Sequence, residues 1–229
     1  MVFQHVQRTI IFVSGVFIMS FGIAVGIRAD LGTTPLASLP TVLSFATPLS
    51  VGWYIVILNM IFFLLQVLIL RRRFTRVQLM QIPITFVFGS FVDLSMYFTR
   101  WIEPTSYLTQ WIWVLVSVVL VAIGVYIETL PRLSYLPGNG VVVALTVVQN
   151  RISFGSNKII LDVVLLIISV AASLLLMGEL AGVREGTVFS AVTVGIIIPI
   201  VEAVHKRFRI RRAGRSFSDP SPGITLNTL

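Results

Sequence analysis

Residues 28–40 read RADLGTTPLASLP and directly follow an apolar segment, Thr9 to Ile27. Gly32 and Pro35 interrupt a helix at this point, because glycine costs helix stability and proline can neither donate the backbone hydrogen bond nor avoid a clash inside a helix. The next apolar stretch, Thr34 to Thr47, falls short of the ~20 residues that a helix needs to cross a bilayer. We therefore predict a short broken or re-entrant helix here.

The same interruption recurs later in the chain. Gly22 and Pro35 correspond to Gly124 and Pro137, with a shift of 102 residues in both cases. Three further pairs follow at shifts of 103, 103 and 109 residues: Gly52 with Gly155, Asn59 with Asp162, and Asp93 with Glu202. Duplicated halves that carry an interrupted apolar segment at the same place are typical of secondary transporters. We predict one repeat over about 9–98 and a second over about 111–205.

Composition sets the class of protein. The 229 residues are 56% hydrophobic and 11% charged, with a mean hydropathy of +0.97, whereas a soluble domain has about 25% charged residues. We predict an all-α polytopic membrane bundle with six transmembrane helices and two short broken helices, the second at Pro137 to Gln149. The six predicted spans are Thr9 to Ile27, Trp53 to Leu70, Val77 to Phe98, Trp111 to Leu130, Ile159 to Met177 and Thr187 to Val204.

Charge placement orients these spans, because Lys and Arg gather on the cytoplasmic side. Six crossings with both termini inside put 14 of the 17 basic residues in the cytoplasm, while eight crossings would put only 10 there. The 14 are Arg8, Arg71, Arg72, Arg73, Arg76, Arg132, Arg151, Lys158 and the six from Lys206 to Arg215. Three crossings in each half then give the two copies opposite orientations, so we expect an inverted repeat.

The net charge of +8 is concentrated next to the membrane, in the loop from Arg71 to Arg76 and in residues 206–215. Anionic lipids attract each such residue by roughly 1 kcal/mol, so lipid accounts for this charge and we expect no nucleic-acid partner. We divide the chain into a membrane domain, 1–205, and a tail, 206–229, that is basic and then disordered. The chain has no cysteine and only two histidines, so we expect no metal site, and we expect no cofactor.

The first candidate site lies at the starts of the two short helices. Thr33, Thr34 and Ser38 supply hydroxyls around Pro35, and Thr33 or Thr34 is a suitable N-cap. Pro137 and Asn139 hold the equivalent place in the second half. A helix N-terminus favours anions, so these residues are candidate substrate ligands. The alternative is a pair of ordinary turns with their hydroxyls bonded to the backbone.

The second candidate set consists of polar residues inside spans. Asn59 and Asp162 occupy equivalent positions and are candidate substrate-binding residues, because polar groups in hydrocarbon are expensive. An ion pair with Lys158 one turn away explains Asp162 equally well. Gln66 and Gln81 are expected to face each other and form an interhelical hydrogen bond rather than a ligand site.

The third candidate set is Arg184, Glu185 and Thr187, in the sequence GVREGT that precedes the last span. Arg184 can bind a carboxylate or an oxyanion through two N–H groups. A capped helix start with an interfacial arginine is the alternative. Charged residues near the broken segments are candidates for gating or coupling, or else surface pairs: Arg28 with Asp30, Glu128 with Arg132, and Asp93.

Four motifs carry a resemblance to a known family: RADLGTTPLASLP from Arg28, QIP from Gln81 with FGSFVD from Phe88, LPGNG from Leu136, and GVREGTV from Gly182. At these residues the chain resembles the YczE/YyaS/YitT-type bacterial integral membrane proteins, over Gly15 to about Val204. The resemblance implies a bacterial inner-membrane protein of about six spans. It does not supply a substrate.

Two functions remain from the sequence. The leading hypothesis is a secondary transporter or exporter of a small solute, with an anion as one candidate. Transport would be coupled to protons through Asp162 or Asp93. The alternative is a non-transporting accessory or immunity-type membrane protein whose polar residues serve helix packing or partner binding. No nucleophile with its base, metal cluster or phosphate loop is recognisable, so we do not expect an enzyme. Homo-oligomerisation stays open.

Overall fold

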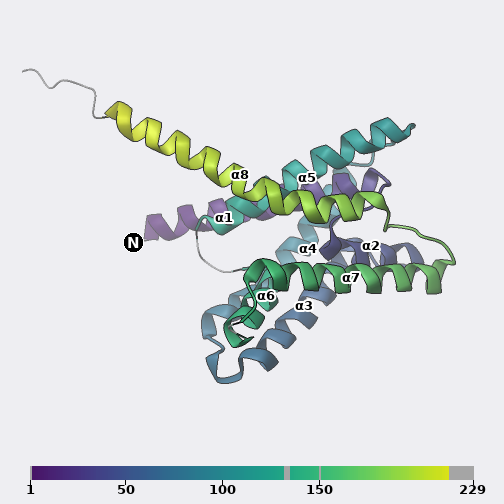
Figure 1. The fold of residues 1–229 in the computed structure, drawn as a ribbon, viewed down its shortest axis with the longest axis horizontal. Coiled ribbons are helices and arrows are strands. Elements are labelled where there is room, and N and C mark those ends of the chain that lie inside the picture. Colours follow the sequence, from purple (N-terminus) through teal and green to yellow (C-terminus); the bar gives the residue numbers. More distant parts are fainter. Residues whose placement is uncertain (1, 132–134, 150, 217–229) are drawn as a thin grey trace, which may run out of the picture.

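The computed structural model describes residues 2–131, 135–149 and 151–216, and this part of the chain is all-helical. Figure 1 shows a bundle of long helices with two short helices packed among them. The elements are α1 (Val2–Arg28), α2 (Pro35–Ala46), α3 (Val51–Leu70), η1 (Arg71–Arg73), η2 (Arg76–Met80), α4 (Gln81–Phe98), α5 (Tyr107–Thr129), α6 (Pro137–Gln149), α7 (Phe154–Met177) and α8 (Glu185–Ser216).

Six of these helices are long and apolar enough to cross a membrane, as the sequence predicts. The candidate spans are Val6–Arg28, Val51–Arg73, Val77–Phe98, Tyr107–Thr129, Phe154–Met177 and Glu185–His205. The two short apolar helices, α2 with 12 residues and α6 with 13, are below the ~20 residues needed to cross. The predicted helical membrane bundle of six long and two short helices is confirmed.

The centre of the bundle is the crossing of α1 and α5. Gly22 faces Val121, and Gly124 faces Met19, so closely that a Cβ atom on either glycine would lie under 3.0 Å from backbone of the other helix. Small residues allow this approach, and the van der Waals packing that results is a main source of helix association in a membrane. Gly15 is close to Glu128 and Gly26 is close to Ser117, so the two helices run antiparallel.

The remaining helices pack around this pair. Helix α4 lies along α1 and α8 lies along α5, while α3 packs on α4. The short helices connect elements that are far apart in sequence, since α2 packs against α7 and α6 packs against α3. In Figure 1 α2 lies toward one end of the bundle and α6 toward the other.

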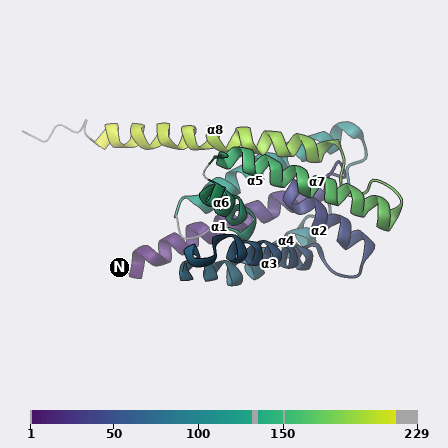
Figure 2. The same ribbon diagram turned by 60° about the horizontal axis from the view of Figure 1, so that its bottom comes forward.

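The N-terminus, the C-terminal end of α8 and the η1–η2 connection lie at the same end of the bundle in both views (Figures 1 and 2). Helix α8 continues beyond His205 to Ser216, so the basic segment that the sequence analysis assigns to the tail begins as a helix. Residues 217–229 lie outside the described residues.

Candidate functional site

The loop between α1 and α2 is held against the start of α8. The carbonyl of Leu31, which is fully buried, accepts a hydrogen bond from the N–H of Gly186 at 2.8 Å. Ser190 Oγ donates to the carbonyl of Thr33 at 3.2 Å. These bonds join two of the motifs singled out in the sequence, and we call residues 29–34 with residues 182–190 the loop cluster.

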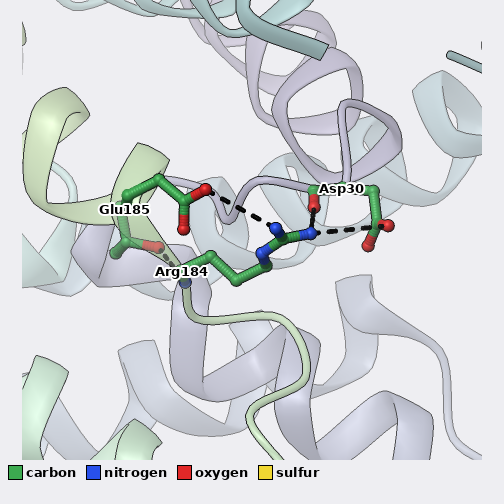
Figure 3. A network of polar contacts seen from close by, with 4 residues as sticks. Asp30, Arg184 and Glu185 are labelled. Carbon is green, nitrogen blue, oxygen red and sulfur yellow. Dashed lines mark hydrogen bonds and ion pairs between the residues drawn. The ribbon is translucent and has the colours of Figure 1, made fainter. Parts of the chain in front are cut away.

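Arg184 ties the loop cluster together at its exposed edge (Figure 3). Its Nη1 donates to the carbonyl oxygen of Asp30 at 2.9 Å and lies 4.0 Å from the carboxylate of the same residue. Its Nη2 lies 3.5 Å from Glu185 Oε1. The arginine fork predicted to bind a solute is therefore engaged by two residues of the protein itself, and its role in substrate binding stays a prediction.

The backbone of the loop explains the glycine in this motif. Asp30 and Gly32 have φ values of 57° and 94°, in the left-handed region. A Cβ atom at Gly32 would collide with the hydroxyl of Thr187, a buried residue whose Oγ1 also accepts from the N–H of Arg184 at 3.5 Å. Only glycine fits both the conformation and the space. Gly32 therefore lets the loop pack against Thr187, and the next residue, Thr33, lies against the first turns of α8, where its carbonyl accepts the bond from Ser190.

A small cleft with room for about one water molecule opens beside the loop cluster. The hydroxyl of Thr33 is buried and has no hydrogen-bond partner within the described part of the chain. A buried hydroxyl of this kind favours a polar ligand or a water molecule, since leaving it unpaired costs about 1–3 kcal/mol. The cleft is lined by Ile27, Asp30, Gly32, Thr33, Thr41, Phe45 and Gly182.

A second polar cluster surrounds the start of α6. Glu128, which is 1% exposed, accepts a hydrogen bond from the N–H of Leu136 through Oε1 at 3.2 Å. Asn59 Oδ1 accepts from the N–H of Gly138 at 3.3 Å. Both acceptors satisfy N–H groups at a helix start, which otherwise have no partner. We call Glu128, Asn59, Gln66, Gln81 and residues 136–138 the α6-start cluster.

Gln66 and Gln81 complete the α6-start cluster from α3 and α4. Each donates its Nε2 to the Oε1 of the other, at 3.0 Å and 3.2 Å, as the sequence predicts. Gln66 also donates to the carbonyl of Pro137 at 3.0 Å. Sequence reasoning missed this last bond, because nothing in the pattern of an apolar span indicates which distant carbonyl a glutamine reaches.

The first turns of the two short helices meet. A Cβ atom on Gly138 would lie 3.1 Å from Cδ2 of Leu36, closer than an ordinary contact, so the flexible Leu36 side chain would have to shift by a few tenths of an ångström. Of the two predicted N-cap residues, Thr33 and Thr34, it is Thr34 that takes the N-cap position of α2, before Pro35, although its side chain makes no capping bond. Ser38 shares a hydrogen bond with Ser169 of α7 at 2.8 Å.

The remaining candidates lie elsewhere. Asp93 Oδ1 accepts from the N–H of Gly52 at 2.8 Å, and Oδ2 accepts from Ser50 Oγ at 2.6 Å, so Asp93 caps the start of α3. Asp162 pairs with Lys158 on its own helix. Arg28 donates to the carbonyl of Met96 at 3.1 Å. Asn139 is half-buried in the first turn of α6, and Arg132 lies outside the described residues.

These features define the class: an integral membrane protein in which two short helices begin inside a bundle of six long ones. The chain belongs to DUF6198, a family of unknown function, which it matches over residues 6–203. No curated protein sequence and no solved structure matches the chain. The family match does not bear on the YczE/YyaS/YitT resemblance, which stays a prediction.

Proposed function

We propose that this protein is a secondary transporter or exporter of a small solute, built as an inverted repeat in a bacterial inner membrane with both termini in the cytoplasm. One observation carries the proposal: the starts of α2 and α6 meet at Leu36 and Gly138 inside the bundle. Interrupted helices that begin near the middle of a membrane protein commonly form its solute site, because their N–H groups point at the ligand.

The α1–α5 crossing supports the repeat. A shift of 102 residues converts the contact between Gly22 and Val121 into the contact between Met19 and Gly124. The same shift converts the contact of Gly15 with Glu128 into that of Ser117 with Gly26. Contacts that exchange in pairs are what a two-fold axis between the helices would produce.

Contacts of the short helices follow the same rule. Ser38 of α2 meets Ser169 of α7, and the equivalent positions, Gly140 of α6 and Gln66 of α3, are also in contact. Each short helix therefore packs on the long helix of the other half. Such an exchange would let the two halves rock about the shared central helices.

The chemistry of the centre favours an anionic or strongly polar solute. The start of α2 offers positive partial charge, because the Thr34 side chain makes no capping bond there, and the unpaired hydroxyl of Thr33 lies two residues before Pro35. Glu128 is the fully buried carboxyl group here, and its Oε2 has no hydrogen-bond partner among the described residues. Asp93 is occupied in capping α3, so Glu128 is a better candidate than Asp93 for proton coupling.

The test is solute flux in proteoliposomes that contain the purified protein. Solutes are first chosen by the rise they cause in the thermal unfolding temperature, since a ligand that binds only the folded state stabilises it. Transport predicts saturable flux that Asp162→Asn and Arg184→Gln reduce without lowering membrane abundance. Ser14→Ala is the matched control, because that hydroxyl is exposed and bonds only within its own helix at 2.9 Å.

A specific observation also favours the accessory alternative. Several intramembrane polar groups bond to other parts of the protein, as Gln66 does with Gln81 and Asp93 with the start of α3. In that case the same variants would lower membrane abundance, and no solute would stabilise the protein. Partner capture by the wild type in the absence of any flux would then identify the accessory role.

A further inference from the structure

The two halves differ in how their last two helices pack. In the first half α3 and α4 cross closely: a Cβ atom on Gly52 would collide with the carbonyl oxygen of Gly89 and with the carboxylate of Asp93. The Asp93 carboxylate accepts hydrogen bonds from the N–H of Gly52 at 2.8 Å and from Ser50 Oγ at 2.6 Å. Helix α4 is thus bound to the first turn of α3, and we call Asp93 with Ser50 and Gly52 the first latch.

Among the described residues, neither Gly155 nor Gly195 brings α7 and α8 into such a contact. Within the described residues α7 does not pack extensively on α8, and Figure 1 shows α8 diverging from α7 toward the end where the N-terminus lies. The buried share of the span is 17% for α7 and 11% for α8, against 39% for α3 and 33% for α4. A Cβ atom on Gly155 would meet only Ser153 Oγ, at 3.9 Å, and one on Gly195 would meet nothing within 4 Å.

The residues of the first latch nevertheless have counterparts in the second half. Ser153 is the N-cap of α7 just as Ser50 is the N-cap of α3, and both hydroxyls accept a backbone N–H of the first turn. Gly155 follows Ser153 at the same spacing as Gly52 follows Ser50. Glu202 of α8 takes the position of Asp93, and Gly195 lies seven residues before it, two turns away on the same helix face.

We propose that α8 closes on α7 in a second conformation, with the carboxylate of Glu202 accepting hydrogen bonds from Ser153 Oγ and the N–H of Gly155. This second latch would form when the first latch opens. The inference rests on the inverted repeat of the proposed function: exchanging the conformations of two equivalent halves converts an arrangement open at one end into one open at the other. A carboxylate at a helix N-terminus is favoured by the backbone dipole, as Asp93 already demonstrates at α3.

Two glycines on open faces support closure by α8 itself. Glycine weakens a helix relative to alanine, and a close approach of a second helix compensates for this loss. In the α1–α5 and α3–α4 crossings each glycine has such an approach, while Gly155 and Gly195 have none in this conformation. A closed α7–α8 pair would give both glycines a close helix–helix approach of the kind that Gly52 has at Gly89.

Cysteine crosslinking in native membranes tests the proposal, because the chain has no cysteine of its own. Gly155→Cys with Ile198→Cys places thiols at the counterparts of Gly52 and Gly89. Gly155→Cys with Ile196→Cys is the matched control, since residue 196 lies on another face of α8. We expect the 155–198 pair to form an intramolecular disulfide under mild oxidation with a yield several-fold above that of the control pair, read as a gel shift reversed by reductant.

Two further substitutions in the crosslinking background measure the latches. Asp93→Asn weakens the first latch and should raise the 155–198 yield, while Glu202→Gln removes the charge of the second latch and should lower it. Equal yields for the two cysteine pairs, or no 155–198 disulfide, would overturn the proposal. A disulfide between two chains would overturn it as well, by making this face a subunit contact.

The readout needs no solute, so the two proposals can fail separately. A 155–198 disulfide in a protein that moves no solute would keep the latch and reject transport. Saturable flux in a protein whose 155–198 and 155–196 yields are equal would keep transport and reject the latch.

Discussion

Arg184 donates a hydrogen bond from Nη1 to the carbonyl oxygen of Asp30 at 2.9 Å, across 154 positions of sequence. The bond fastens the loop that follows α1 to the residue that precedes α8, and the buried bond between Gly186 and Leu31 lies next to it. The broken segment of the first half is therefore shaped by the last span of the second.

Arg184→Gln should weaken this attachment. The side chain is 36% exposed, so solvent moderates the loss, and we expect the free energy of unfolding to fall by about 1 kcal/mol. Thermal unfolding in detergent measures the change. Arg8→Gln, at an exposed position on α1, is the control, and an equal effect of the two substitutions would show that the contact with Asp30 contributes nothing.

Gly124→Ala should be among the most damaging small changes in the chain. Its Cβ would press into the backbone of α1 at Met19, and the helices would have to separate. Overpacking of this kind costs about 1–3 kcal/mol. Gly195→Ala is the matched control, because nothing lies within 4 Å of the added atom. Unfolding temperatures that fall equally for both variants would contradict the close crossing.

Gln66 and Gln81 should behave as a coupled pair. Gln66→Leu removes bonds to Gln81 and to the carbonyl of Pro137, and we expect a loss of about 0.6–2 kcal/mol. Because the single change leaves a buried amide unpaired, the double variant with Gln81→Leu should lose less than the sum of the two single losses. A double-mutant cycle of unfolding free energies decides this, and strict additivity would mean that the two amides do not interact.

The sequence predicts the class and the helices well, for a physical reason. Long apolar segments and short ones broken by Pro35 or Pro137 are local properties, and the bilayer accepts few other arrangements. Six long spans, two short helices and the Gln66–Gln81 pair are confirmed, and of the two predicted N-cap residues, Thr33 and Thr34, it is Thr34 that takes the N-cap position.

The partners of the candidate residues could not be predicted in the same way. That Arg184 reaches Asp30, or that Glu128 caps the start of α6, depends on how helices from the two halves cross. The crossing in turn depends on where Gly22 and Gly124 let α1 and α5 approach, which is a tertiary contact rather than a local pattern. Sequence symmetry also does not indicate that α4 packs on α3 while α8 packs on α5 and not extensively on α7.

Glu128→Gln should separate packing from proton coupling. The amide oxygen can still accept the hydrogen bond from Leu136 N–H, so we expect normal abundance and an unfolding temperature close to that of the wild type. Glu128→Leu loses the acceptor and should cost about 1–3 kcal/mol. If Glu128 carries the coupled proton, flux through Glu128→Gln should no longer respond to a pH gradient. A variant that follows the gradient as the wild type does would exclude this role.

The opposite entry of the two short helices can be tested by single cysteines in the otherwise cysteine-free chain. Thr34 and Asn139 lie beside the contact between Leu36 and Gly138. Labelling of cysteines at these two positions would therefore report whether the reagent reaches the centre of the bundle, rather than the side of the membrane from which each helix enters. The last residues of α2 and α6, Ala46 and Gln149, are better reporters, because both are exposed. Helix α2 lies toward one end of the bundle and α6 toward the other (Figure 1). With a membrane-impermeant maleimide, Ala46→Cys should react in intact cells and Gln149→Cys only in inverted vesicles. Reaction of both from one side would make the halves parallel and would remove the main support for rocking about a central site.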